Sequence, residues 1–271
     1  MMPSLPIAPE QPLLLFTDLD GTLIDHHSYS AEKSRLAILR LAQRGIPLIF
    51  CSSKTFAEQI HLQRELGIIQ PFIVENGSAV AIPKGYFSTP ALSADTAYDL
   101  IPLVQVDAAY IRREMAHYQG IQGFTGATDL ELNKATGLTG DALKYARDRS
   151  YTETLLTPLT PETEAFIRPL LALKGLTISR GGRFFSVQSA NTDKGRAVRW
   201  LADHFSQHLS AQPLLAACGD SANDASMLSA VDLPFLVQQP GKKWADMDIP
   251  GLVKVPEVGP AGFSRVVQML L

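Results

Sequence analysis

The chain has 271 residues, which predicts one large domain or two of modest size. Apolar residues make up 46% and charged residues 19%, a balance that allows a sizeable core and excludes a wholly disordered chain. Lysine and arginine number 24 against 27 acidic residues, and the net charge of −3 provides no basic field for binding nucleic acid or a membrane surface.

The amino terminus and the apolar runs bear on location. Residues 1–12 are interrupted by prolines and lack the basic start of a signal peptide, so we expect a short flexible lead-in there. The apolar runs are far shorter than the ~20 residues of a membrane-spanning helix. We therefore expect a cytoplasmic enzyme with no membrane or nucleic-acid partner. The sequence does not indicate its oligomeric state.

The first part of the chain alternates between short apolar runs and stretches with helical spacing. Strands are expected over 13–17, 46–51 and 71–75, and helices over 30–44 and 55–66. The dipeptide Asn76-Gly77 then favours a tight turn. Such alternation is typical of a parallel sheet covered by helices.

The pattern changes between residues 84 and 189 and then returns. The changed stretch predicts helices over 98–118, 129–135, 139–147 and 161–173, and strands over 151–156, 176–179 and 183–187. Alternation resumes with helices over 194–208, 223–229 and 260–270 and strands over 213–218 and 233–237. We therefore predict an α/β fold, a Rossmann-like parallel-sheet core interrupted by an inserted α+β cap domain. The core is expected over 1–83 and 190–271, and the cap over 84–189.

Two aspartates directly follow the first expected strand. Asp18 and Asp20 lie two residues apart, and Gly21 after them allows a tight turn. Ligands of parallel α/β sheets bind at the carboxyl ends of strands, so both carboxylates are expected to face a site. Such hard oxygen donors suit Mg²⁺. The plain alternative is an ordinary Asp-Gly turn, and the glycine comes too early for an EF-hand calcium loop.

A second polar segment, 219–224, follows the strand expected over 213–218. Asp220 there is positioned to complete a metal site, although the residue types around it also favour plain helix capping. Ser52 ends another expected strand, and Lys194 begins a helix. A hydroxyl, a lysine and helix N-terminal amides are what a phosphate-binding site needs. Taken singly, such a serine is commonly a cap and such a lysine is commonly solvated.

Together and in this order, the four elements resemble the motifs of the haloacid dehalogenase superfamily of phosphotransferases. The matching motifs are Asp18-Leu19-Asp20-Gly21-Thr22, Ser52, Lys194, and Gly219-Asp220-Ser221-Ala222-Asn223-Asp224. The resemblance spans 13–82 and 190–271, and the insert between the second and third motifs resembles the larger α/β cap of that superfamily.

The resemblance implies a phosphatase that works through an aspartyl-phosphate intermediate. Asp18 would be the nucleophile, and Asp20 would protonate the leaving oxygen and then activate water. Ser52 and Lys194 would hold the phosphoryl oxygens and neutralise their developing charge.

The resemblance also implies a Mg²⁺ cofactor. The Asp18 carboxylate, the main-chain carbonyl of Asp20 and the Asp220 carboxylate would be its ligands. Asn223 and Asp224 would support these ligands from behind.

A narrower resemblance, to mannosyl-3-phosphoglycerate phosphatases, rests on the segments 51–55, 74–77 and 182–185. It implies a phosphorylated sugar-acid substrate, mannosyl- or glucosyl-3-phosphoglycerate, and a role in compatible-solute synthesis. The candidate substrate-binding residues are Lys54, Glu75, Asn76, Arg180 and Arg183. The two arginines flank a flexible glycine pair, and a guanidinium pairs with carboxylates in a bidentate manner. Solvated arginines, and turn formation alone at 75–76, are the alternatives.

Other functions are compatible with the same residues. A broader sugar-phosphate phosphatase would share the core chemistry. A phosphotransferase or mutase would pass the phosphoryl group to another sugar instead of to water. A metal-dependent sugar-phosphate sensor with a degenerate core is a third class, and the intact motif acids argue against it.

Overall fold

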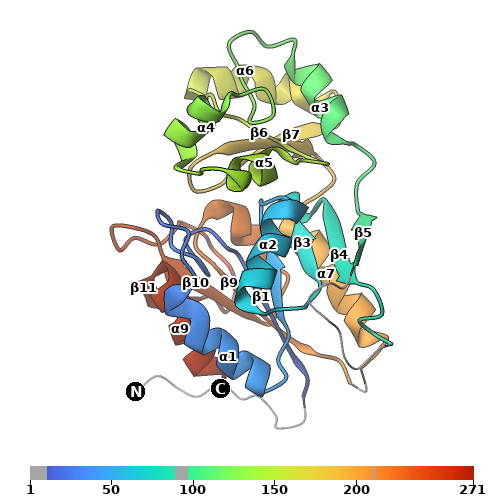
Figure 1. Cartoon of the computed structure of the whole chain (residues 1–271), viewed down its shortest axis with the longest axis vertical. Coiled ribbons are helices and arrows are strands. Elements are labelled where there is room, and N and C mark those ends of the chain that lie inside the picture. Colours follow the sequence, from blue (N-terminus) through green and yellow to red (C-terminus); the bar gives the residue numbers. More distant parts are fainter. Residues whose placement is uncertain (1–10, 89–96, 210) are drawn as a thin grey trace.

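The computed structural model describes residues 11–88, 97–209 and 211–271, so most of the expected lead-in lies outside the described residues. The described chain builds two sheets, which Figure 1 shows in two units, one above the other. The larger sheet has eight strands in the order β11 (Val253–Val258), β10 (Leu233–Gln238), β9 (Leu214–Gly219), β1 (Leu13–Thr17), β2 (Leu48–Cys51), β3 (Phe72–Val74), β4 (Ala79–Pro83) and β5 (Tyr98–Pro102).

Neighbouring strands of the larger sheet run parallel from β11 to β3, whereas β4 and β5 are added in antiparallel fashion. The predicted α/β class with a Rossmann-like sheet is therefore confirmed. Helices cover both faces of this sheet. One face carries α1 (Arg35–Gln43), α2 (Phe56–Leu66) and α9 (Gly259–Leu270), and the other carries α7 (Lys194–Ser206) and α8 (Ala225–Leu228). Three short 3-10 turns complete this unit: η1 (Glu32–Ser34), η2 (Glu75–Gly77) and η3 (Ala222–Asp224).

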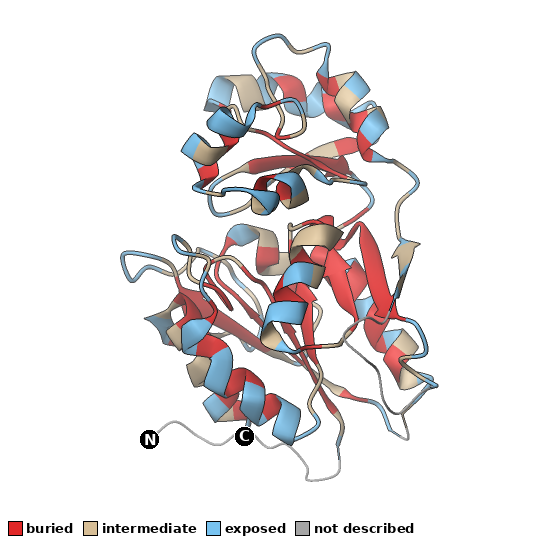
Figure 2. Cartoon of the chain, viewed as in Figure 1, coloured by how far each residue is buried: buried red, intermediate tan, exposed pale blue. Residues whose placement is uncertain are grey.

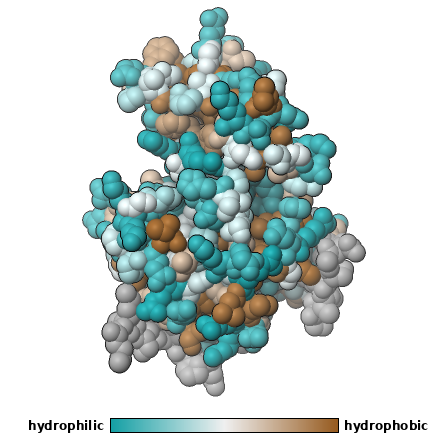
Figure 3. Space-filling model, turned by 60° about the vertical axis from the view of Figure 1, so that its left-hand side comes forward, coloured by the Kyte–Doolittle hydropathy of each residue, from teal (hydrophilic) through white to brown (hydrophobic). Residues whose placement is uncertain are grey.

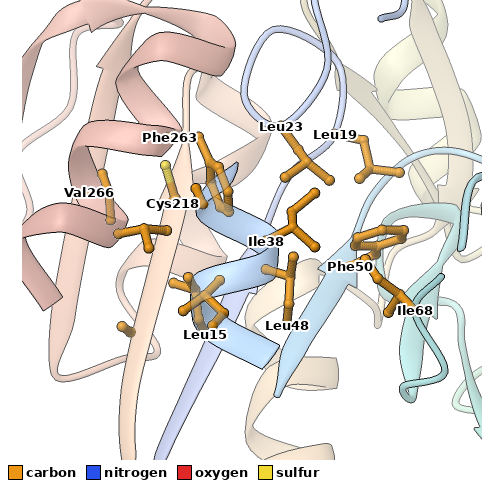
Figure 4. Packing of buried hydrophobic residues seen from close by; sticks show 14 of the residues in the cluster. Leu15, Leu19, Leu23, Ile38, Leu48, Phe50, Ile68, Cys218, Phe263 and Val266 are labelled. Carbon is orange, nitrogen blue, oxygen red and sulfur yellow. The ribbon is translucent and has the colours of Figure 1, made fainter. Parts of the chain in front are cut away.

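The central strand β1 shows why the sheet must be covered on both sides. Leu13 and Leu15 pack under α1 and α9, while Leu14 and Phe16 pack under α7. All four side chains are buried. Figure 2 shows that the strands at the centre of this sheet consist mainly of buried residues. Figure 4 shows Leu15 in the cluster that also contains Phe263 of α9. Each such side chain contributes about 1.5–3 kcal/mol when it is fully buried.

The smaller sheet lies in the upper unit of Figure 1 and is antiparallel. Its strands are β6 (Glu153–Thr154), β8 (Phe185–Ser189) and β7 (Leu176–Arg180), in that order. The helices packed with it are α3 (Ala108–Met115), α4 (Asp129–Thr136), α5 (Asp141–Arg147) and α6 (Pro161–Ala172). This unit has two hydrophobic clusters of its own, so it buries apolar surface without using the larger sheet.

The helix expected over 98–118 is wrong in its first part. Residues 98–102 form β5, and the helix itself is only α3. Pro102 cannot donate the backbone hydrogen bond that a helix interior requires, and Asp107 starts a new helix by accepting from the Tyr110 amide at 2.8 Å. β5 thus falls within the expected cap range of 84–189 and yet pairs with β4 in the larger sheet. The sequence reading also missed β4 and β11.

Figure 3 shows one face of the molecule coloured by hydropathy. Hydrophilic residues cover most of the face seen in Figure 3, and hydrophobic residues appear there in separate patches. Within the described ranges, none of the helices combines the length and the apolar character that crossing a membrane requires.

A close backbone approach joins η2 to the start of α7. Gly77 has a φ of +94°, and a Cβ atom built on it would lie 2.2 Å from the Asp193 carbonyl oxygen. Only glycine therefore lets the turn after β3 touch the residue that precedes Lys194. Gly67 also has left-handed backbone, with a φ of +66°, but a Cβ atom built on it would have no other atom within 4 Å.

This pair of glycines separates backbone strain from steric clash. Gly67→Ala is expected to lower the free energy of unfolding by about 1–2 kcal/mol, the cost of left-handed backbone in an ordinary residue. Gly77→Ala is expected to lower it by a further 1–3 kcal/mol or so, because atoms must also move apart. Urea unfolding of both variants measures the difference, and equal losses would contradict the close packing.

Candidate active site

Three neighbouring strands deliver the polar residues of the site to one edge of the sheet. β1 lies between β9 and β2, with Thr17 opposite Cys218 on one side and Phe50 on the other. The next residues along these strands are therefore neighbours in space, and the Asp18 amide donates to the Cys218 carbonyl at 2.9 Å. This arrangement brings Asp18 and Ser52 to the edge where Asp220 follows β9.

A buried lysine lies between two aspartates at this edge. Lys194 Nζ is 2.6 Å from Asp18 Oδ1 and 2.7 Å from Asp224 Oδ1. Carboxylate oxygens of Asp18, Asp220 and Asp224 all lie within 4.8 Å of one another, and all three residues are buried. When all three carboxylates are ionised, their three negative charges against one ammonium give this cluster a net charge of −2.

Burial and mutual repulsion set the protonation of this cluster. Burial, followed by the charge of Asp224, raises the pKa of Asp18 to about 7 even though Lys194 opposes the shift. The same two causes, in the same order, raise the pKa of Asp220 well above its ordinary value. Although burial opposes it, the charges of Asp18 and Asp224 raise the pKa of Lys194, so that group stays charged. A divalent cation would suit these buried hard oxygen atoms, and it would neutralise the net charge of −2 that the cluster carries when its carboxylates are ionised.

Local hydrogen bonds hold these side chains in place. Asp193 caps α7 by accepting from the Arg196 amide at 2.8 Å, which places Lys194 in the first turn. Asp224 Oδ2 accepts from the amides of Asp220 and Ser221 at 3.0 and 3.1 Å, while its Oδ1 accepts from Lys194. Asp224 therefore braces both the loop after β9 and the lysine, as a supporting residue would.

The other motif residues lie around this cluster. Asn223 lines a cavity that begins beside Asp18 and is described below, and the Asn223 Oδ1 atom accepts a hydrogen bond from the Ser221 hydroxyl at 2.6 Å. Ser52 is buried, and its Oγ accepts from the Lys54 amide at 3.3 Å. Ser53, rather than Ser52, reaches the cavity wall.

Asp20 belongs to a second charged network. Lys54 Nζ lies 3.2 Å from both Asp20 Oδ2 and Glu58 Oε1. Asp20 Oδ1 is buried and has no hydrogen-bond partner among the described residues. Lys54 also stands 5.0 Å above the ring of Tyr29. Asp20 thus presents one paired oxygen and one unpaired oxygen beside Asp18.

A cavity extends from Asp18 and Asp20 into the space between the two units. Its walls come from the larger-sheet unit and from the smaller one, and its lining includes Asp18, Asp20, His26, Tyr29, Lys54, Glu58, Asn76, Arg149, Phe184 and Arg183.

Two of the lining residues, Asn76 and His26, have distinctive surroundings. Asn76 has left-handed backbone with a φ of 59°, and its side-chain amide donates to Gln188 Oε1 at 3.1 Å. Its Oδ1 is buried without a partner among the described residues. Burial, followed by the charge of Arg183, lowers the pKa of His26, which favours its neutral form.

The remaining predicted substrate residues divide. Arg183 lines the cavity, donates to the Tyr29 hydroxyl and lies over the Tyr29 ring. Arg180 lines a different cavity, on the smaller unit, and lies 5.4 Å from the Phe185 ring. Glu75 is absent from the lining of the active-site cavity described above.

Glu75 instead joins the two units. Its carboxylate accepts from the amides of Ser150, Tyr151 and Thr152 at 2.9, 3.1 and 2.8 Å, and from the Thr152 hydroxyl at 2.7 Å. These hydrogen bonds use both oxygens of a buried side chain. The structure therefore gives Glu75 the geometry of a structural brace for 150–152, in place of the substrate contact expected from the sequence.

Several cavity residues were not predicted from the sequence, among them Tyr29, Glu58 and Arg149. Glu58 carried a signal, because Thr55 and Glu58 form a capping box at the start of α2. That signal indicates a helix start and says nothing of a site. Arg149 lies in an ordinary polar stretch after α5, and only the fold brings it to the cavity.

Comparison with known proteins agrees with this geometry. Residues 15–243 match the model of the haloacid dehalogenase-like hydrolase family. A glucosyl-3-phosphoglycerate/mannosyl-3-phosphoglycerate phosphatase from Persephonella marina is 36% identical over 266 residues, covering 96% of this chain and 97% of the relative. A mannosyl-3-phosphoglycerate phosphatase from Pyrococcus horikoshii is 33% identical, covering 90% of this chain and 98% of the relative.

A solved structure shares the fold. BT1666 from Bacteroides thetaiotaomicron, a phosphatase of the same superfamily, aligns with a TM-score of 0.64 and 17% identity over 98% of both chains. The chain belongs to the haloacid dehalogenase-like hydrolase family. Within that family it is a phosphatase, a hydrolase of phosphoric monoesters.

The crowding of carboxylates predicts a pH-dependent effect on stability. A carboxyl whose pKa is raised by folding destabilises the folded state above that pKa, and this cost disappears below the ordinary value of 3.8. Asp18→Asn removes the charge, so in the presence of a chelator it is expected to raise the free energy of unfolding at pH 8 by about 1–4 kcal/mol. The gain should shrink towards pH 4.

Chemical denaturation at both pH values measures this change. Asp203→Asn, which alters an exposed carboxylate of α7, is the matched control and should change little. A destabilised Asp18→Asn protein at pH 8 would show that Lys194 outweighs the repulsion.

Proposed function

We propose that this phosphatase hydrolyses mannosyl- or glucosyl-3-phosphoglycerate, with Mg²⁺, through an aspartyl-phosphate on Asp18. The observation that carries the proposal is the buried cluster in which Lys194 lies 2.6 Å from Asp18 while two further carboxylates stand nearby. The names of relatives that match almost the whole chain support the choice of substrate.

Asp18, Asp220 and the main-chain carbonyl of Asp20 would hold the magnesium ion. Bound there, the cation supplies charge neutralisation for the phosphoryl group and for the carboxylates. The two uncompensated negative charges of the cluster support this assignment. Asp224 and Asn223 would keep the loop after β9 in position through the hydrogen bonds described above.

The chemistry would begin at Asp18. One of its oxygens attacks phosphorus, the bond from phosphorus to the ester oxygen breaks, and Asp20 donates a proton to that leaving oxygen. Asp20 then takes a proton from water as the water attacks phosphorus and releases Asp18 and inorganic phosphate. Lys194 and Ser52 would stabilise the charge that develops on the phosphoryl oxygens. The unpaired oxygen of Asp20 supports its role in proton transfer.

The smaller unit would serve as the cap over the leaving group. We propose that the cap proper comprises the three-stranded sheet with α3 to α6, and that β5 belongs to the core. Phe184 and Arg183 of this unit line the same cavity as Asp18, which supports a contact with the part of the substrate beyond the phosphate. Arg180 would act within the cap and not on the substrate.

The experiment that tests the function is phosphate release from a panel of phosphorylated metabolites. With Mg²⁺, mannosyl- and glucosyl-3-phosphoglycerate are expected to give kcat/KM values well above those of simple hexose phosphates. Chelation should abolish turnover and Mg²⁺ should restore it, because the carboxylate cluster cannot otherwise bear the phosphate charge. Asp18→Asn should lower turnover by several orders of magnitude while it stays folded. Full activity in excess chelator, or in Asp18→Asn, would overturn the mechanism.

Two further variants separate chemistry from specificity. Arg183→Ala is expected to lower kcat/KM for the sugar-phosphoglycerate about 10–150-fold, the effect of losing one charge-assisted contact of about 1.5–3 kcal/mol. Its effect on p-nitrophenyl phosphate should be much smaller, because that ester lacks the sugar-acid group. Lys194→Ala should reduce both activities alike, since Asp18, which Lys194 contacts, and the phosphoryl group, which it is proposed to bind, serve both substrates. If Arg183→Ala lowers both by the same factor, Arg183 does not act in specificity.

A further inference from the structure

Arg149 stands at the cavity wall where the cap meets the core. Its Nη1 donates to the Ser53 carbonyl at 3.2 Å and to the Thr152 hydroxyl at 2.9 Å. Its guanidinium also lies 5.9 Å from the Phe124 ring. The side chain is therefore held by the core, through Ser53, and by the cap, through Thr152 and Phe124.

The opposite edge of this guanidinium lacks a protein partner. Nε is buried and makes no hydrogen bond to any residue that the structure describes. Within the same ranges, Nη2 makes none either, while Nη1 makes both hydrogen bonds given above. A buried donor left unpaired costs about 1–3 kcal/mol, so a ligand that supplies the acceptor gains that much. Two adjacent N–H groups in one plane match the two oxygens of a carboxylate.

The charges of the cavity point the same way. Outside the buried carboxylate cluster, its cationic residues are Lys54, Arg149 and Arg183, and its acidic residues are Asp20 and Glu58. Lys54 is paired with both of those acids. Three cationic side chains against two acidic ones leave an excess of one positive charge in this part of the cavity. The proposed leaving group carries one carboxylate, which would balance that charge.

The two arginines are not equivalent. Arg183 is exposed, and its guanidinium is already in contact with the Tyr29 hydroxyl and with the rings of Tyr29 and Phe184. Arg149 is half-buried, is held by both units and has a free edge. Arg149 is thus the better organised of the two for a bidentate contact.

We infer that Arg149 is a specificity residue that binds the glycerate carboxylate of the substrate through Nε and Nη2. The inference rests on the proposed function and adds to it the side chain that recognises the carboxylate of the substrate. Arg183, which is exposed and lines the same cavity, is then left to the sugar.

The test pairs one substrate change with one protein change. Mannosyl-3-phosphoglycerate is compared with the same compound whose carboxylate is a methyl ester. The wild-type protein is expected to prefer the acid by roughly 10–150-fold in kcat/KM, as loss of a charge-assisted contact implies. Arg149→Gln is expected to bring that ratio to within about threefold of unity.

Matched variants control for folding and for general charge. Arg147→Gln removes an arginine that lies two residues away and pairs with Asp129, outside the cavity lining, and should keep the wild-type ratio. Arg183→Ala should lower the rates for acid and ester by the same factor. If Arg149→Gln does not fold, Arg149→Lys decides, because one ammonium cannot form the bidentate contact and the ratio should still fall severalfold.

The outcomes separate the two proposals. If the wild-type protein releases no phosphate from either sugar-phosphoglycerate, the proposed function fails. If it does so but shows no preference for the acid over the ester, the inference fails. The inference also fails if the Arg149 variants keep the wild-type ratio of acid to ester, even where both rates fall. A purely structural residue would lower both rates by one factor and leave that ratio unchanged.

Discussion

The contact on which the site depends is the one between Lys194 and the two aspartates beside it. An ammonium at 2.6 and 2.7 Å from two carboxylates is stable in a buried place only because their charges offset its desolvation. The third carboxylate, Asp220, adds to a charge balance that is already negative when the carboxylates are ionised. Several parts of the core meet at this cluster: β1 and β9 end beside it, α7 begins there, and Gly77 brings the turn after β3 against the residue before Lys194.

The core elements of the site were predictable from the sequence because their positions follow from local rules. A buried apolar run ends at Asp18, another ends before Asp220, and Asp193 caps the helix that carries Lys194. Parallel strands bring such ends together whatever the rest of the chain does. The strand ends therefore suffice to bring Asp18 and Asp220 together, whereas Lys194 and Asp224 were assigned to the same site through the family resemblance.

The parts that could not be predicted depend on contacts between segments far apart in the sequence. Glu75 was expected at the substrate, yet its carboxylate accepts hydrogen bonds from 150–152, some 75–77 residues away. Arg149 has no motif, and its position follows from Ser53, 96 residues away. β5 was misread because its apolar residues run into the next helix, and only its pairing with β4 makes it a strand. Local patterns contain no information about such pairings.

The same few residues connect recognition of the leaving group with the phosphoryl site. The turn after β2 contains Ser52, which is proposed to bind the phosphoryl group, and Ser53, whose carbonyl accepts a hydrogen bond from Arg149. Glu75, at the end of the next strand, fixes the backbone just after Arg149. A residue of the inserted unit is thereby positioned by the core, although it belongs to the cap in sequence. Specificity then does not depend on the cap alone: a substrate carboxylate on Arg149 would complete a contact between the two units, so the acid would help to hold the cap over the group that reacts.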